Sequence, residues 1–144
     1  VTAHVTIPEG GAEGVLSCFG GEFGGWSLFV QGGKLKYVHN YLKLKEYSVE
    51  SNIPVPTGTH ELGFKFVPTE TSLKPDFFIG DVTLLIDGKE VGTLTGMKSA
   101  GQYSAVTGYG LVTGRNPNTP VTHQYETPFA FTGDLEKVTI VLDK

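Results

Sequence analysis

Residues 24–41 read GGWSLFVQGGKLKYVHNY, two stretches of alternating residues on either side of a Gly-Gly pair. A two-residue turn at this pair predicts an antiparallel hairpin between residues 26–31 and 34–41. One face of the hairpin then carries three pairs: Val30 with Leu35, Leu28 with Tyr37, and Trp26 with His39. The other face carries two: Phe29 with Lys36, and Ser27 with Val38. Because most of the large apolar groups share one face, we expect a half-buried hairpin that packs on a core.

The rest of the chain repeats short alternating stretches between turns. Further strands are predicted over residues 1–7, 14–19, 44–49, 60–67, 81–86, 89–94, 109–114 and 131–142. Asp87-Gly88 is a favoured pair for a two-residue turn in which both φ values are positive, and it predicts a second hairpin. Its inward residues are Val82, Leu84, Ile86 and Val91, and the last strand offers Val138, Ile140 and Leu142. Residues 98–105 are small and polar, which predicts a loop or an irregular edge, and residues 115–129 predict a long ordered loop.

The composition agrees with short strands and tight turns, since the 144 residues include 20 Gly, 8 Pro and 9 Phe. No long stretch has apolar residues at helical spacing. We therefore predict an all-β fold, a single two-sheet antiparallel sandwich over residues 1–144, with a closed barrel as the weaker alternative. The predicted core joins the two sheets through Trp26, Leu28, Val30, Leu35, Tyr37, Leu84 and Ile86.

Several partner classes are disfavoured by charge and composition. The net charge is −4 and the pI is about 5.5, which argues against a phosphate-backbone binder. No apolar run approaches the roughly 20 residues of a membrane span. Cys18 is the single cysteine, so an intrachain disulfide and a cysteine zinc cluster are excluded. We predict no nucleic-acid partner, no membrane partner, no metal and no cofactor. Because the chain begins at Val1, we expect a domain cut from a longer protein.

The sequence shows no catalytic constellation, and we predict no catalytic residue. The Gly-x-Ser-x-Gly string of serine hydrolases is missing, and the glycine-rich residues 20–25 lead into a strand instead of a phosphate-binding helix. The four histidines have no metal-ligand spacing. Two carboxylate pairs could share a strand face. Glu46 and Glu50 are discounted because Glu50 lies at the strand end beside polar loop residues, and Asp134 and Glu136 are interpreted as solvated on the outer face of the last strand. Cys18 lies among apolar residues and is interpreted as a small buried hydrophobe.

One segment is richer in polar chemistry than packing requires. Residues 114–125 read GRNPNTPVTHQY and contain the only arginine of the chain. Loops at the end of a sandwich often carry binding function. The candidate ligand-binding residues are Arg115, Asn116, His123 and Tyr125 in this loop, with Tyr41 and Lys36 on the hairpin. The alternative is a loop held in place by hydrogen bonds of Arg115 and Tyr125. It has no carboxylate before Glu126, which makes it a poor calcium site.

These stretches, taken in order, resemble a known family. The hairpin of residues 24–41 is followed by LLIDGK at 84–89, GR at 114–115, TPV at 119–121, Tyr125, PFAFTG at 128–133 and KV at 137–138. From about Gly14 onward the chain is similar to the domain that follows the catalytic domain in many bacterial arylsulfatases. The resemblance implies a concanavalin-like or laminin-G-like jelly roll without catalysis of its own. It also implies a periplasmic or secreted location.

Two features bear on how far the resemblance extends. The sulfatase signature Cys-x-Pro-x-Arg is missing, because Cys18 is followed by Phe19-Gly20-Gly21-Glu22. This chain therefore cannot hydrolyse a sulfate ester by the formylglycine mechanism. Asn116 stands where an aspartate commonly follows the Gly-Arg pair in the family, which argues against a cation site there.

Two hypotheses on function follow. The first is an accessory domain that packs on, or oligomerises, a sulfatase catalytic domain in the same chain. The second is a carbohydrate-binding module for sulfated or neutral glycans, which needs exposed rings and a cation for sulfate. Rings are available at Tyr41, Tyr47, Tyr103, Tyr109 and Tyr125, and cations at Lys34, Lys36, Lys43 and Lys45. A glycosidase is the weakest alternative, since no carboxylates are convincingly paired.

Overall fold

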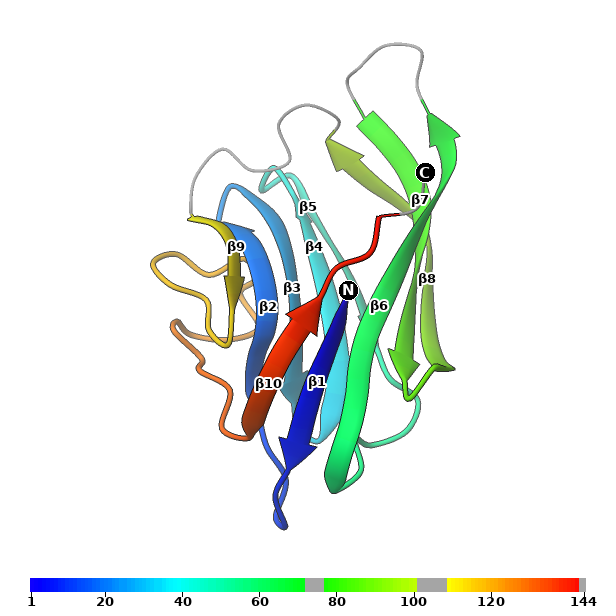
Figure 1. Ribbon diagram of the computed structural model, residues 1–144. Helices are drawn as coiled ribbons and strands as arrows, with labels where there is room; N and C mark the ends of the chain where they lie inside the picture. Colours follow the sequence, from blue (N-terminus) through cyan, green and yellow to red (C-terminus); the bar gives the residue numbers. More distant parts are fainter. Residues whose placement is uncertain (72–76, 101–108, 143–144) are drawn as a thin grey trace.

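The computed structural model describes residues 1–71, 77–100 and 109–142. Two five-stranded antiparallel sheets pack face to face (Figure 1), which confirms the predicted sandwich. The first sheet has the order β10-β1-β6-β7-β8, and the second has the order β5-β4-β3-β2-β9. None of the described residues belongs to a helix of the length and apolar character needed to cross a membrane.

Each predicted strand has a counterpart in the structure. The first sheet consists of β1 (Thr2–Ile7), β6 (Gly58–Thr71), β7 (Phe77–Ile86), β8 (Lys89–Ala100) and β10 (Asp134–Thr139). The second consists of β2 (Gly14–Gly21), β3 (Gly24–Gln31), β4 (Lys34–Tyr41), β5 (Lys45–Glu50) and β9 (Tyr109–Thr113). Residues 98–100 belong to β8, an edge strand with two register shifts against β7, so they form the irregular edge and not the loop. Residues 101–105 lie outside the described residues.

The β3–β4 hairpin has the predicted register. Trp26 pairs with His39, Leu28 with Tyr37 and Val30 with Leu35. Its turn requires positive φ at both central positions, and these are Gly32 (φ 61°) and Gly33 (φ 76°). A Cβ atom added at either glycine would have no neighbouring atom within 4 Å. Glycine is therefore favoured here by the backbone conformation and not by a lack of space for a side chain.

The main core lies between the sheets and includes most of the predicted residues. Its buried members are Ala3, Val5, Ile7, Leu16, Leu28, Val30, Leu35, Tyr37, Leu62, Phe64, Val82, Leu84, Ile86, Val91 and Met97. Trp26 is only partly buried, but its ring packs edge-on against Phe64 of the facing sheet at 5.1 Å. Trp26 therefore joins the two sheets at the border of the core.

The last strand is shorter than predicted. β10 ends at Thr139, which pairs with Thr2 at the beginning of β1. The described residues after this pair, 140–142, belong to no strand, and Ile140 and Leu142 are 41% and 86% exposed. The prediction that these two residues reach the core is wrong, whereas Val138 packs against it.

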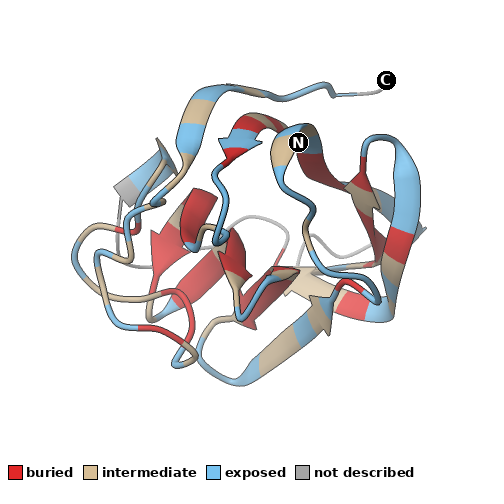
Figure 2. Cartoon of the chain, turned by 90° about the horizontal axis from the view of Figure 1, so that it is seen from below, coloured by how far each residue is buried: buried red, intermediate tan, exposed pale blue. Residues whose placement is uncertain are grey.

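A second, smaller core covers the outer face of the second sheet. The irregular segment after β9 folds over β2, β3 and β4, and buried residues extend from the strands into this loop (Figure 2). The cluster consists of Val15, Cys18, Phe29, Val38, Val121 and Tyr125. The hairpin is thus buried on both faces and is not the half-buried hairpin that the sequence predicts.

Candidate functional site

The long loop is organised around the buried side chain of Asn116. Its Oδ1 accepts hydrogen bonds from the Val121 N–H at 2.9 Å and the Tyr125 hydroxyl at 2.7 Å. Its Nδ2 donates to the carbonyls of Pro117 and Thr119, both at 3.0 Å. Both amide hydrogens and the amide oxygen are therefore used within the loop, so Asn116 has a structural role instead of the predicted ligand-binding role.

Tyr125 holds the loop against the sheet. Its ring packs on Phe29 and Phe129, with ring centroids 5.0 Å away in each case. Its hydroxyl lies 2.9 Å from Ser27 Oγ. Burial raises the pKa of this phenol, although the hydrogen bond with Ser27 acts in the opposite direction. The predicted packed ring is confirmed, but the hydroxyl is buried and does not reach the rim.

Arg115 does not have the organising role that the sequence predicts. The residue is exposed, and no described residue accepts a hydrogen bond from its guanidinium. Its backbone carbonyl instead accepts from the Cys18 thiol at 3.4 Å. Burial raises the pKa of Cys18 to about 12, so the thiol stays protonated and unreactive at neutral pH.

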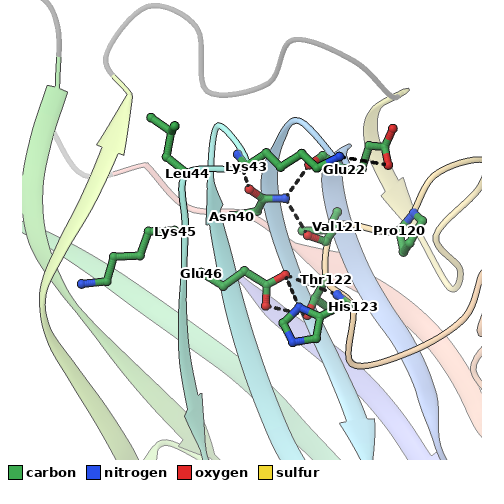
Figure 3. A pocket seen from close by; sticks show the side chains of 10 residues that line it. All are labelled: Glu22, Asn40, Lys43, Leu44, Lys45, Glu46, Pro120, Val121, Thr122 and His123. Atoms are coloured by element: carbon green, nitrogen blue, oxygen red, sulfur yellow. Dashed lines mark hydrogen bonds and ion pairs between the residues drawn. The ribbon is translucent and has the colours of Figure 1, made fainter.

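A pocket of about 380 Å³ lies between the β4–β5 turn and residues 120–123 (Figure 3). Its size falls within the range of about 300–1,000 Å³ of small-molecule sites. The lining residues come from four chain segments: Glu22, Asn40, Lys43, Leu44, Lys45, Glu46, Pro120, Val121, Thr122 and His123.

Asn40 fixes three of these segments from the base of the pocket. Its buried Nδ2 donates to the carbonyls of Glu22 and Val121, both at 2.9 Å. Its Oδ1 accepts from the Lys43 N–H at 2.8 Å. Leu42 and Lys43 have φ values of 49° and 61°, so the turn is tight and its shape depends on this side-chain bond.

Glu46 joins β5 to the loop on the other side of the pocket. It accepts from the Thr122 hydroxyl at 3.0 Å and from the His123 N–H at 3.3 Å. Nδ1 of His123 lies 3.2 Å from the same carboxylate; the His123 side chain is 85% exposed and that of Glu46 is 22% exposed. The Thr122 hydroxyl also accepts from the Gln124 N–H at 3.2 Å and is buried, which makes it a poor nucleophile.

The lysines of the hairpin region do not form one cationic surface. Lys43 Nζ lies 3.9 Å from the Glu22 carboxylate, on the pocket rim. The side chain of Lys45 points to the other side of β5 (Figure 3), where its ammonium lies over the Tyr47 ring. Lys36 lies 3.2 Å from Gln31 Oε1 and 3.9 Å from Glu50, and Lys34 donates to the Ser51 carbonyl.

Of the six predicted site residues, the structure brings Asn116 and Tyr125 together and separates the other four. His123 lies at the pocket, Asn116 and Tyr125 are inside the loop, and Arg115 points to solvent. Tyr41 is at the end of β4 beneath Lys98, 5.3 Å from its ammonium, and Lys36 is paired elsewhere on the sheet. Tyr103 and the side chain of Tyr109 lie outside the described residues.

Sequence reasoning missed most of the pocket, including Glu22, Asn40 and Thr122. One signal was available in the pairing of β4 with β5, which sets Asn40 opposite Glu46 on the outer face. That pairing places an amide and a carboxylate at one end of the sheet, next to the polar loop.

The polar groups that line the pocket are hydrogen-bond donors and acceptors. Among the described lining residues, no exposed hydroxyl or thiol lies next to a base. Among the described residues, no group of three or more His, Cys, Asp and Glu side chains is placed to hold a metal ion. Comparison with known proteins found no matching family model, curated protein or solved structure.

Proposed function

We propose that this chain is a non-catalytic accessory domain of an arylsulfatase-like hydrolase, where it packs on or oligomerises the catalytic domain. The observation that carries the proposal is the role of the family-like loop in the fold. Its Asn116 and Tyr125 bond to each other and are buried, so the stretch that resembles the family builds a scaffold.

Exposed apolar residues on β9 and after β10 are available for such packing. β9 and β10 are the end strands of their sheets, and they lie on the same side of the molecule (Figure 1). Leu111 of β9 is 49% exposed, and Val141 and Leu142 after β10 are 71% and 86% exposed. The exposed Leu111 on the end strand β9 and the exposed apolar residues that follow β10 favour contact with another domain.

The gene that encodes the chain gives the direct test of this role. We expect a sulfatase domain with the Cys-x-Pro-x-Arg signature to be encoded upstream in the same reading frame. The purified chain should not turn over a chromogenic sulfate ester or glycoside. Turnover by the pure chain that is abolished by Thr122→Val or Cys18→Ala would overturn the non-catalytic assignment.

A second candidate function is carbohydrate binding, which the pocket specifically favours. The pocket combines carboxylates and an ammonium with the apolar groups of Leu44 and Pro120. Sugar rings present hydroxyls at their edges and apolar C–H groups on their faces, which fits such a mixed lining.

Calorimetric titration with oligosaccharides tests the second candidate. We expect binding in the micromolar to millimolar range, weakened by His123→Ala and Leu44→Ser at the rim. If no oligosaccharide binds at millimolar concentration, carbohydrate binding is refuted and the accessory role alone remains.

A further inference from the structure

The charged side chains of the described residues that point into the pocket are mostly negative. Figure 3 shows the side chains of Glu22 and Glu46 at opposite sides of the pocket and Lys43 extended between the β4–β5 turn and Glu22. Lys45 contributes no charge here, because its side chain points away across β5. Among the described residues whose side chains point into the pocket, two carboxylates thus face a single ammonium.

That ammonium already has partners. Lys43 Nζ lies 3.9 Å from Glu22 and 4.5 Å from the centre of the Phe23 ring. An anionic group in the pocket would have to compete with Glu22 for this lysine and would stand near a second carboxylate. Like charges placed together in a binding site are strongly unfavourable.

Hydroxyl groups meet no such obstacle. Glu22 has one long contact with Lys43 and keeps lone pairs free to accept from hydroxyls. Glu46 is held in place by Thr122 and His123 and keeps acceptor capacity on Oε2, which accepts one hydrogen bond from a described residue. Leu44 and Pro120 provide apolar contact for the face of a ring.

We infer that the pocket binds a neutral, polyhydroxylated sugar residue and discriminates against its O-sulfated counterpart. The inference rests on the proposed carbohydrate-binding function and narrows it to the unsulfated part of a glycan. Glu22 and Lys43 determine this specificity. Both side chains are about half exposed, so they can be replaced without opening a core.

The test is a pair of calorimetric titrations at pH 7 and 0.15 M salt, with a neutral oligosaccharide and the same oligosaccharide carrying O-sulfate groups. We expect the neutral ligand to bind about tenfold more tightly. Glu22→Gln should reduce the preference, and Glu22→Lys should reverse it. The matched control is Glu90→Gln, because Glu90 forms a similar exposed pair with Lys65 at 3.3 Å, on the other sheet.

The possible outcomes distinguish failure of the preference for neutral sugars from failure of carbohydrate binding itself. A neutral preference that Glu22→Lys reverses and Glu90→Gln leaves unchanged supports the inference. Equal or tighter binding of the sulfated ligand overturns it, although carbohydrate binding stands. Binding of neither ligand at millimolar concentration overturns both. Thermal melts of each variant without ligand show that the fold is retained.

Discussion

The hydroxyl of Tyr125 donates a hydrogen bond to Oδ1 of Asn116 at 2.7 Å inside the loop that covers the second sheet. Both side chains are buried, and Asn116 also donates to two backbone carbonyls. A buried amide that uses both donors and its acceptor specifies one loop conformation, because any alternative leaves polar groups unpaired.

Asn116→Asp tests whether the amide itself is required. A carboxylate keeps the acceptor for Tyr125 and Val121, but it turns an oxygen toward the carbonyls of Pro117 and Thr119. We expect the free energy of unfolding to fall by about 2–4 kcal/mol, the cost of lost donors and buried charge. Urea denaturation followed by the fluorescence of Trp26, the single tryptophan, measures it.

Arg115→Ala is the neighbouring control for this substitution. Its exposed guanidinium has no partner among the described residues, so the change should stay within about 0.5 kcal/mol. Equal stability of Asn116→Asp and the parent chain would contradict the structural role of the amide and would reopen the loop as a ligand site.

The hairpin and the loop differ in how far they follow from sequence. The register of β3 and β4 follows from local alternation and the Gly-Gly turn, so it is predictable. The burial of the outer face is not predictable in this way, because alternation within a strand does not show that Phe29 and Val38 meet the distant loop residues Val121 and Tyr125.

The pocket is hard to predict for the same reason, because it depends on contacts between segments that are distant in sequence. Arg115 has more donors than Asn116, but donor number does not decide which of two adjacent side chains points inward. The pocket joins Glu22, Asn40 and Glu46 through hydrogen bonds to a distant loop. Only the cross-strand pair of Asn40 and Glu46 is local enough to be predicted.

Trp26→Ala should destabilise the sandwich although Trp26 is only partly buried. Its ring contacts Phe64 at 5.1 Å and stacks on Tyr37 at 6.5 Å, so truncation removes contacts with both sheets. We expect a loss of about 3 kcal/mol, measured by calorimetry or far-UV circular dichroism because the fluorophore is removed. Leu44→Ala, at a 76% exposed position, is the control and should cost less than about 0.5 kcal/mol. A loss below about 1 kcal/mol for Trp26→Ala would show that Trp26 is a surface residue.

His60 should make the protein more stable at mildly acidic pH. Hydrogen bonds to the Thr57 carbonyl and to Asp87, at 2.9 Å and 2.6 Å, raise the pKa of His60 above its usual value of 6.5. Desolvation raises the pKa of Asp87, but hydrogen bonds from the Glu61 N–H and from His60 outweigh it and lower this pKa overall. The stabilisation from His60 is fully present below pH 6.5 and is lost as the pH rises through its raised pKa.

Asp87→Asn tests this pair without disturbing the turn, since Asn tolerates the φ of 51° at this position. The pKa of His60, followed by NMR, should fall toward its usual value. The pH dependence of the free energy of unfolding above pH 6.5 should become smaller in the variant. An unchanged titration of His60 in the variant would show that Thr57 alone causes the shift.

His39 should have the opposite effect. It lies on the inward face opposite Trp26, is buried, and has no hydrogen-bond partner for Nδ1 among the described residues. Burial lowers its pKa to about 4. Because the unfolded chain binds this proton with a pKa of 6.5, the stability contributed by neutral His39 is complete above pH 6.5 and is lost as the pH falls toward 4.

His39→Phe removes the titration and keeps a planar ring. We expect the variant to be at least as stable as the parent at pH 7, because a buried polar atom without a partner is removed. Its advantage should grow by on the order of 2–3 kcal/mol as the pH falls from 7 to 4. Urea denaturation of both proteins across this range measures the difference. A constant difference would show that His39 takes up its proton without loss of the fold, which would place Nδ1 in contact with water.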